Sequence, residues 1–263
     1  MPKIQNETLH TIEKRKSTRA FADIPITPEE KEIILHAAFR APTAGNMMLY
    51  TIIEVEDQAI KEHLAVSCDN QPFIAKAPYV LIFLADYQRW VDFYNLSGAK
   101  ERCAELGLPY RKPQAGDFLL AVTDAVIAAQ NAVIAAESLG IGSCYIGDII
   151  ENFEDNRRLF SLPRYTFPAA LLCFGRPNRE HTPETQIPRF DPQFIIHKNT
   201  YHHLDAAGLE RMMQPRQEKY PTGQYLPGAQ NLGQHEYFRK FNADFSYEMS
   251  RSVREALKNW DCE

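Results

Sequence analysis

Residues 117–147 of this chain read DFLLAVTDAVIAAQNAVIAAESLGIGSCYIG. Alanines recur in the first part at a helical period, and their small side chains allow a neighbouring backbone to pack closely. Gly140 suits the end of such a helix because glycine adopts the left-handed conformation found there. The stretch therefore predicts a long helix from Asp117 to Leu139, followed by a short strand at Cys144–Ile146. The repeated alanines are Ala125, Ala128, Ala129, Ala132, Ala135 and Ala136.

The composition is that of a globular protein with one large core. Of its 263 residues, 44% are hydrophobic and 24% are charged, so no disulfide or metal is needed for folding. A net charge of −5 argues against a nucleic-acid partner, since a surface that neutralises many phosphates must be basic. The N-terminal residues lack the apolar segment of a secretory signal, which favours a cytoplasmic protein.

Two further features of the composition favour a protein that neither spans a membrane nor carries disulfides. Residues 118–139 are long enough to cross a bilayer, but polar side chains interrupt them and favour a buried helix instead; these are Asp124, Gln130, Asn131 and Glu137. The cysteines show no C-x-x-C or zinc-finger spacing and predict reduced, buried thiols. They are Cys68, Cys103, Cys144, Cys173 and Cys262.

The rest of the chain predicts alternating helices and strands. Thr27-Pro28-Glu29-Glu30 provides an N-cap, a proline in the first turn and acidic residues, as at a helix start. The almost wholly apolar segment 79–84 predicts a central strand covered on both faces. Alternation of this kind implies α/β or α+β layering. The other expected elements are a helix over 28–40, strands at 50–55 and 166–174, a helix over 151–160, proline-rich loops at 176–200 and 215–233, and an amphipathic helix over 245–260.

A compact basic run, Arg15-Lys16-Ser17-Thr18-Arg19, follows a short predicted helix. Guanidinium groups, an ammonium and a hydroxyl suit the binding of a phosphate. The alternative is an ordinary solvated charged face, because short basic runs are common. Its place before a helix that ends in Ala41-Pro42-Thr43-Ala44-Gly45-Asn46 favours the first interpretation.

Four motifs in this order resemble the FMN-dependent nitroreductase family, its larger NADPH-dependent branch most of all. They are Arg-x-Ser-x-Arg at 15–19, the turn at 41–46, Ser-Leu-Gly-Ile-Gly-Ser-Cys-Tyr-Ile-Gly at 138–147, and Leu-Leu-Cys-Phe-Gly-Arg-Pro at 171–177. The resemblance covers residues 10–190. It implies an α+β fold with a mixed central β-sheet flanked by helices, in an intertwined homodimer. It also implies a single FMN-binding domain over 1–263, in which 176–263 form extended loops and a C-terminal helix that wrap the core or the partner chain.

The resemblance also implies a set of cofactor-binding residues. Arg15, Lys16 and Ser17 would lie near the FMN phosphate and ribityl chain, and Arg19 near N1 and the C2 carbonyl. Gln71 would face the pyrimidine edge, and the late Arg189 would close over the phosphate. The backbone of Tyr145, Ile146 and Gly147 would pass near N5, where glycine permits close approach. From the partner chain, the flavin would be contacted by Pro42, Thr43, Ala44 and Asn46.

Three residues depart from the family pattern around the ring. Met47 and Met48 replace a common Gln-Pro, and ordinary core methionines are the alternative to a role at the substrate side. Asp148 stands where many relatives have a second glycine, and an anion there must point away from the flavin or pair with a cation. The histidines at 197, 202 and 203 match no standard ligand spacing, so we predict no metal site.

The expected activity is a ping-pong oxidoreduction. NADPH or NADH gives hydride to FMN, leaves, and is replaced by a nitroaromatic, a quinone or a flavin. Arg19 would stabilise the negative charge that reduction places around N1, and no catalytic side-chain acid is required. The alternatives are a reductase or dehydrogenase specific for one metabolite on the same fold, and a non-catalytic flavin-binding protein.

Overall fold

A computed structural model describes residues 6–179, 189–218 and 225–260. The chain divides into two compact units. The sheet unit comprises Met1–Pro183 and Glu248–Glu263, and the helical unit comprises Glu184–Tyr247. The single domain over 1–263 stays a prediction.

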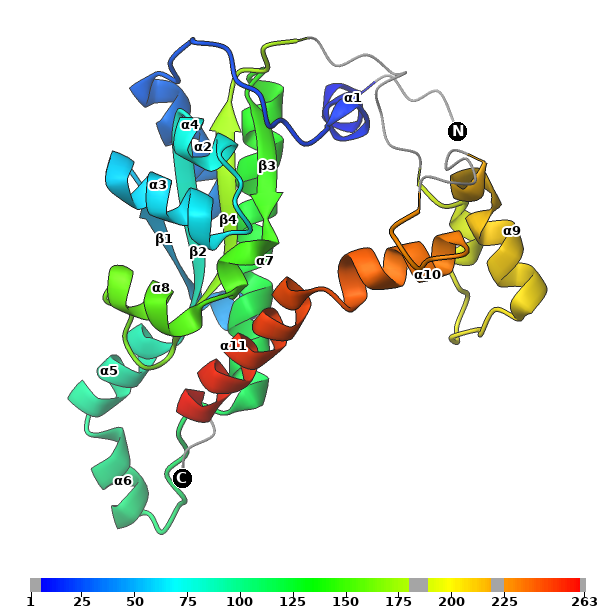
Figure 1. Cartoon of the computed structure of the whole chain (residues 1–263). Coiled ribbons are helices and arrows are strands. Elements are labelled where there is room, and N and C mark those ends of the chain that lie inside the picture. The colour runs from blue at the N-terminus through cyan, green and yellow to red at the C-terminus, as the bar shows by residue number, and fades with distance from the viewer. Residues whose placement is uncertain (1–5, 180–188, 219–224, 261–263) are drawn as a thin grey trace. The chain divides into compact units, whose positions relative to one another are not determined.

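A four-stranded sheet forms the centre of the sheet unit (Figure 1). Its strands are β1 (Tyr50–Glu54), β2 (Tyr79–Asp86), β3 (Gly142–Ile146) and β4 (Thr166–Gly175), in the order β1-β2-β4-β3. The predicted strands are confirmed, and β2 is central, with every residue buried. All three strand pairs are antiparallel, and the parallel component of the expected mixed sheet is an isolated bridge between Ser17 and Ser143.

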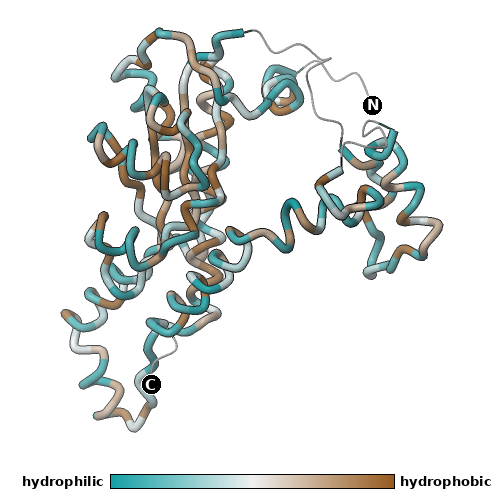
Figure 2. The backbone as a smooth tube through the Cα atoms, in the orientation of Figure 1, coloured by the Kyte–Doolittle hydropathy of each residue, from teal (hydrophilic) through white to brown (hydrophobic). Residues whose placement is uncertain are grey.

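Helices cover both faces of the sheet because side chains along β2 alternate between two apolar clusters. Leu81 and Phe83 pack with helices α2 (Pro28–Phe39) and α7 (Ala115–Ser138). Val80 and Ile82 pack on the other face with α3 (Gln58–Ser67) and α4 (Phe73–Lys76). Figure 2 shows the hydrophobic residues concentrated along the strands. The helix predicted over 28–40 is confirmed, and Thr27 and Glu30 form its capping box.

Helix α7 buries its alanine stripe inside its own chain. Five of the six alanines are wholly buried in the α2–α7 cluster, and Ala135 is half-buried. The alanine stripe therefore faces the sheet and α2 of the same chain, which need the close approach that alanine allows. In the described residues α7 is the one helix long and apolar enough to cross a membrane by length and composition.

A third apolar cluster joins α7 to the C-terminal helix α11 (Asp244–Trp260). Helix α11 confirms the amphipathic helix predicted over 245–260. The Trp260 ring meets Phe118 edge-on at 5.3 Å between centroids, and Tyr165 at 5.6 Å. The remaining helices of the sheet unit are α1 (Glu7–Lys14), α5 (Gln88–Leu96), α6 (Ala99–Glu105) and α8 (Phe153–Leu159), and η2 (Gly147–Ile150) follows β3. The helix predicted over 151–160 is α8.

The helical unit contains η4 (Pro192–Phe194), α9 (Ala206–Gln217), α10 (Leu232–Glu236) and the π-helix η5 (Tyr237–Phe241). The loop predicted from Pro215 is wrong at its start, because α9 continues through Pro215. A proline has a helical φ, and in the last turn it removes only one backbone hydrogen bond.

The thiols are free where the structure describes them. Cys68, Cys144 and Cys173 are buried as predicted, whereas Cys103 on α6 is partly exposed. Cys262 lies outside the described residues.

Candidate functional site

The basic motif lies against the outer edge of the edge strand β3. The Thr18 amide donates to the Ser143 carbonyl at 2.8 Å, and Ser17 forms the parallel bridge to Ser143. Gly142 permits this approach, because a Cβ there would lie 2.7 Å from the Thr18 Cβ. A side chain at 142 would therefore push the motif away from the strand.

The charges of the motif converge on β3. The positive charge of Arg15 lowers the pKa of Glu137, Cys144 and Tyr145. The charge of Arg19 lowers the pKa of Cys144 in the same way. Burial raises the pKa of Glu137, which accepts a hydrogen bond from the Ser143 hydroxyl at 2.9 Å. Burial likewise raises the pKa of the Cys144 thiol, and the two arginines and the Ser17 hydroxyl oppose that rise. Arg15, Ser17 and Arg19 therefore surround one end of β3.

Gln71 lies on the same side of the sheet, between α3 and α4. Its side-chain amide donates to the Cys68 carbonyl at 2.9 Å and to the Asp148 carboxylate at 2.8 Å. The Arg19 guanidinium lies 6.0 Å from the centre of the Phe73 ring, two residues further along the chain. The charge of Asp148 also raises the pKa of the Cys144 thiol. Arg19 and Gln71 therefore lie on the same side of β3, Arg19 near Cys144 and Gln71 near Asp148, which follows the strand.

The end of β3 presents open backbone. Gly147 is exposed, and a Cβ there would meet no atom within 4 Å. The Tyr145 side chain turns to the opposite face of the sheet, where its hydroxyl lies 3.4 Å from Gln130 Oε1 on α7, and Ile146 is buried on the α3–α4 side. The side chains of Tyr145 and Ile146 are therefore engaged elsewhere, and only their backbone can contact a ligand, as the resemblance implies.

The Pro42–Asn46 turn lies at the other end of the sheet. The buried carboxylate of Asp124 accepts hydrogen bonds from the Ala44 amide at 3.0 Å and the Leu49 amide at 3.2 Å. Thr43 accepts from the Met48 amide at 3.0 Å, and Asn46 has a positive φ of 57°. Asp124 and Glu137 are about 20 Å apart along α7, at about 1.5 Å per residue. One chain therefore does not bring this turn to the basic motif.

The remaining residues considered from the sequence lie elsewhere. Arg189 is exposed in the helical unit. Met47 and Met48 are partly buried and pack against core clusters, and the Met47 carbonyl accepts from the Trp90 indole at 2.8 Å. Within residues 6–179, 189–218 and 225–260 no three His, Cys, Asp or Glu side chains are placed to hold a metal ion.

The chemistry of these groups fits FMN. The cations and hydroxyl of the motif suit a phosphate. The half-buried Gln71 amide suits a heterocycle edge, and the open Gly147 backbone leaves space for a flat ring.

The family comparison agrees with this chemistry. The model of the nitroreductase family matches residues 12–176. The chain belongs to the nitroreductase family.

Its relatives in this family include proteins named as nitroreductases and as an FMN reductase. It is 33% identical, over 82% of its length and 83% of the relative's, to the oxygen-insensitive NADPH nitroreductase of Salmonella typhimurium. It is 32% identical to the NADPH-dependent FMN reductase of Bacillus subtilis, over 74% of this chain and 75% of that protein. The crystal structure of nitroreductase A from Vibrio parahaemolyticus superposes with a TM-score of 0.78 at 25% identity, covering 97% of this chain and 98% of that chain.

Two residues that shape the site, and one contact within it, were not predicted from the sequence. Asp124 was considered only as an interruption of an apolar helix, although a lone carboxylate there signals a buried polar anchor. Phe73 lies two residues after Gln71 in the sequence, and its ring contacts Arg19. The contact between Asp148 and Gln71 joins residues 77 positions apart, and no local pattern could have indicated it.

Proposed function

We propose that this protein is an NAD(P)H-dependent FMN oxidoreductase that passes hydride by a ping-pong mechanism to nitroaromatics, quinones or flavins. The observation that carries this proposal is that Arg15, Ser17 and Arg19 lie along β3 beside Ser143 and Cys144, while Gln71 contacts Asp148, the residue after the open Gly147 that follows this strand. The names of the relatives, an NADPH nitroreductase and an FMN reductase, support the activity.

In this proposal the protein supplies binding, orientation and charge. Bound FMN supplies the hydride-accepting atom, N5. Arg15, Lys16 and Ser17 hold its phosphate and ribityl chain. Arg19 stabilises the negative charge that develops on the pyrimidine ring, which is where a fixed cation contributes most to such a reaction.

We further infer that the active form is a homodimer with FMN at the interface. The face of α7 opposite the alanine stripe exposes Leu119, Leu120 and Val126, which are 65%, 42% and 40% accessible. Leu9 and Ile12 on α1 are also exposed, and apolar surface of this kind commonly marks a protein interface. A partner chain would bring its own Pro42, Thr43, Ala44 and Asn46 to the site, which explains why one chain holds this turn apart. We place the dimer in the cytoplasm.

Spectroscopy of the purified protein tests the cofactor. A yellow protein with flavin absorbance is expected, and steady NADPH oxidation with menadione or a nitrofuran should follow. A colourless protein that does not take up added FMN would refute the proposal.

The same assay separates the alternatives. Bound FMN without NAD(P)H oxidation would indicate a non-catalytic flavin-binding protein. Turnover with one metabolite at least about a hundredfold more efficient than with any quinone or nitroaromatic would indicate a dedicated reductase or dehydrogenase.

A further inference from the structure

Asp148 is the one acidic side chain in direct contact with a predicted flavin-binding side chain in the described residues. Its Oδ2 lies 2.8 Å from Gln71 Nε2, and its carboxyl group also forms a hydrogen bond with Glu151. Asp148 follows the open Gly147 in the chain. Its charge raises the pKa of the Cys144 thiol, which in turn interacts with Ser17 of the basic motif. The residue therefore lies within the candidate site, but its charge is engaged by Gln71 and Glu151.

The hydrogen bonds of Gln71 fix the direction of its amide. Both acceptors of its Nε2 group, the Cys68 carbonyl and the Asp148 carboxylate, have no hydrogen to donate. Rotating the amide by half a turn would set its oxygen against two other oxygens, so the orientation is unambiguous. In the part of the chain that the structure describes, no donor reaches Gln71 Oε1.

We propose that Asp148 is a positioning residue of the flavin site, which holds the Gln71 amide so that its carbonyl oxygen is the atom offered to FMN. This inference rests on the proposed function and sharpens it. The pyrimidine edge of oxidised FMN carries two carbonyl acceptors and a single donor, N3–H. An amide that offers only an acceptor must pair with N3–H, and a glycine at position 148 would leave the Cys68 carbonyl as the single acceptor that holds the amide in this orientation.

Glu151 completes the arrangement by supplying a proton. Two carboxyl groups form a hydrogen bond only when one is protonated, and Glu151 is the buried one, with 7% of its surface exposed. Its Oε1 has no partner among the described residues, which is less costly for a neutral acid than for a carboxylate. The raised pKa of Glu151 favours its protonated form, which has a proton to donate to Asp148, while Asp148 accepts from Gln71.

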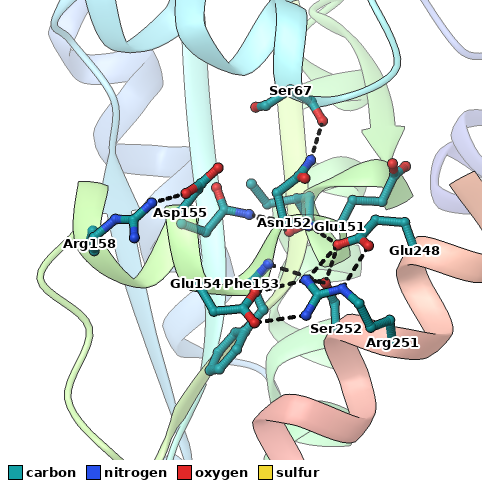
Figure 3. Close-up of polar contacts among 12 residues, drawn as sticks. Ser67, Glu151, Asn152, Phe153, Glu154, Asp155, Arg158, Glu248, Arg251 and Ser252 are labelled. Atoms are coloured by element: carbon teal, nitrogen blue, oxygen red, sulfur yellow. Dashed lines mark hydrogen bonds and ion pairs between the residues drawn. The ribbon is translucent and has the colours of Figure 1, made fainter.

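The surroundings of Glu151 favour this assignment. Asp148 and Asp69 face it from the adjoining loops and Glu248 from α11, and Cys68 lies beside Asp148. The nearest cation on α11, Arg251, lies between Glu154 and Glu248 and bonds to both (Figure 3). Burial and the facing carboxylates together raise the pKa of Glu151 to about 7.

Flavin discrimination by the full-length protein tests the inference. Dissociation constants are measured by fluorescence titration for FMN and for 3-methyl-FMN, which lacks the N3–H donor. The wild-type protein is expected to prefer FMN by at least about tenfold, the effect of one good hydrogen bond. Asp148→Ala and Gln71→Ala should both reduce the preference to below about threefold. Asp148→Asn retains an acceptor oxygen and should restore it.

The outcomes are distinguishable. If Asp148→Ala weakens both flavins equally and leaves their ratio at the wild-type value, Asp148 has only a structural role and the inference is wrong. Circular dichroism establishes that each variant is folded, and the Asp148→Asn ratio decides the matter should the alanine variant not fold. If the wild-type protein binds neither flavin, the proposed function itself fails, and this inference with it.

Discussion

Arg19 is the residue on which the proposed chemistry depends most, and it contributes little to the fold. It is exposed, and its contact with Phe73 is the longer kind of cation–π pair, at 6.0 Å. Arg19→Ala should therefore change the free energy of unfolding by less than about 0.5 kcal/mol. Flavin reduction by NADPH should slow roughly 10- to 100-fold, because the cation acts on charge that develops during the reaction. Stopped-flow absorbance and urea unfolding measure the two effects, and Arg254→Ala, an exposed arginine of α11, is the control.

Glu151 makes the stability of the protein depend on pH. Its pKa is raised from 4.5 to about 7 in the folded state, mainly by burial and by Asp148. The folded protein then keeps a proton that the unfolded chain loses near pH 4.5, so this contribution to stability is present at low pH and is lost as the pH rises toward 7. Between pH 5 and pH 8 the wild-type protein should lose roughly 2 kcal/mol relative to Glu151→Gln, at about 1.4 kcal/mol per pKa unit.

Urea unfolding of both proteins at several pH values measures that difference. Glutamine keeps a hydrogen-bond donor for Asp148 but does not titrate, so it removes the proton without removing the contact. Parallel pH profiles for the two proteins would show that Glu151 does not hold the proton.

At the scale of elements, Gly142 in β3 and Gly147 directly after it allow a matched pair of variants. A Cβ at Gly142 would lie 2.7 Å from the buried Thr18 Cβ, whereas a Cβ at Gly147 would meet no atom within 4 Å. Gly142→Ala should therefore lower the free energy of unfolding by roughly 1 to 3 kcal/mol. Gly147→Ala should leave it within about 0.5 kcal/mol, yet weaken FMN binding about tenfold or more by filling the space for the ring. Thermal unfolding without flavin and FMN titration separate the two effects, and tight FMN binding by Gly147→Ala would contradict the proposed site.

The elements that the sequence predicted well are those with a local cause. The α2 start follows from the Thr27–Glu30 capping box, and β2 from its unbroken apolar run. The course of α9 through Pro215 was not predicted, because a proline in a last turn costs one hydrogen bond that packing can offset. Which elements cover the α7 alanines was not predicted either, because periodicity defines a face of a helix without saying what packs against it.

Features of the site also divide into those with a local cause in the sequence and those without one. The basic motif and the Pro42–Asn46 turn could be recognised as local patterns in the sequence. The residues that hold these segments in place could not be recognised in this way. Asp124 bonds to residues that are 75 and 80 positions away in the sequence, and Asp148 bonds to Gln71, which is 77 positions away. Which side chains meet over such separations depends on strand order and helix rotation, which a single sequence does not specify.

For the whole molecule, the separation of the turn from the basic motif predicts that each site is shared between two chains. Arg19→Ala should inactivate the sites to which a chain gives its basic motif, and the double variant Thr43→Ala, Asn46→Ala those to which it gives its turn. In a hybrid dimer of the two variants one site carries both defects and the other carries none. Unfolding and refolding an equal mixture should therefore restore about a quarter of the wild-type activity by random pairing. Refolding each variant alone is the control, and a mixture no more active than the mean of the separate variants would show that each site is built within one chain.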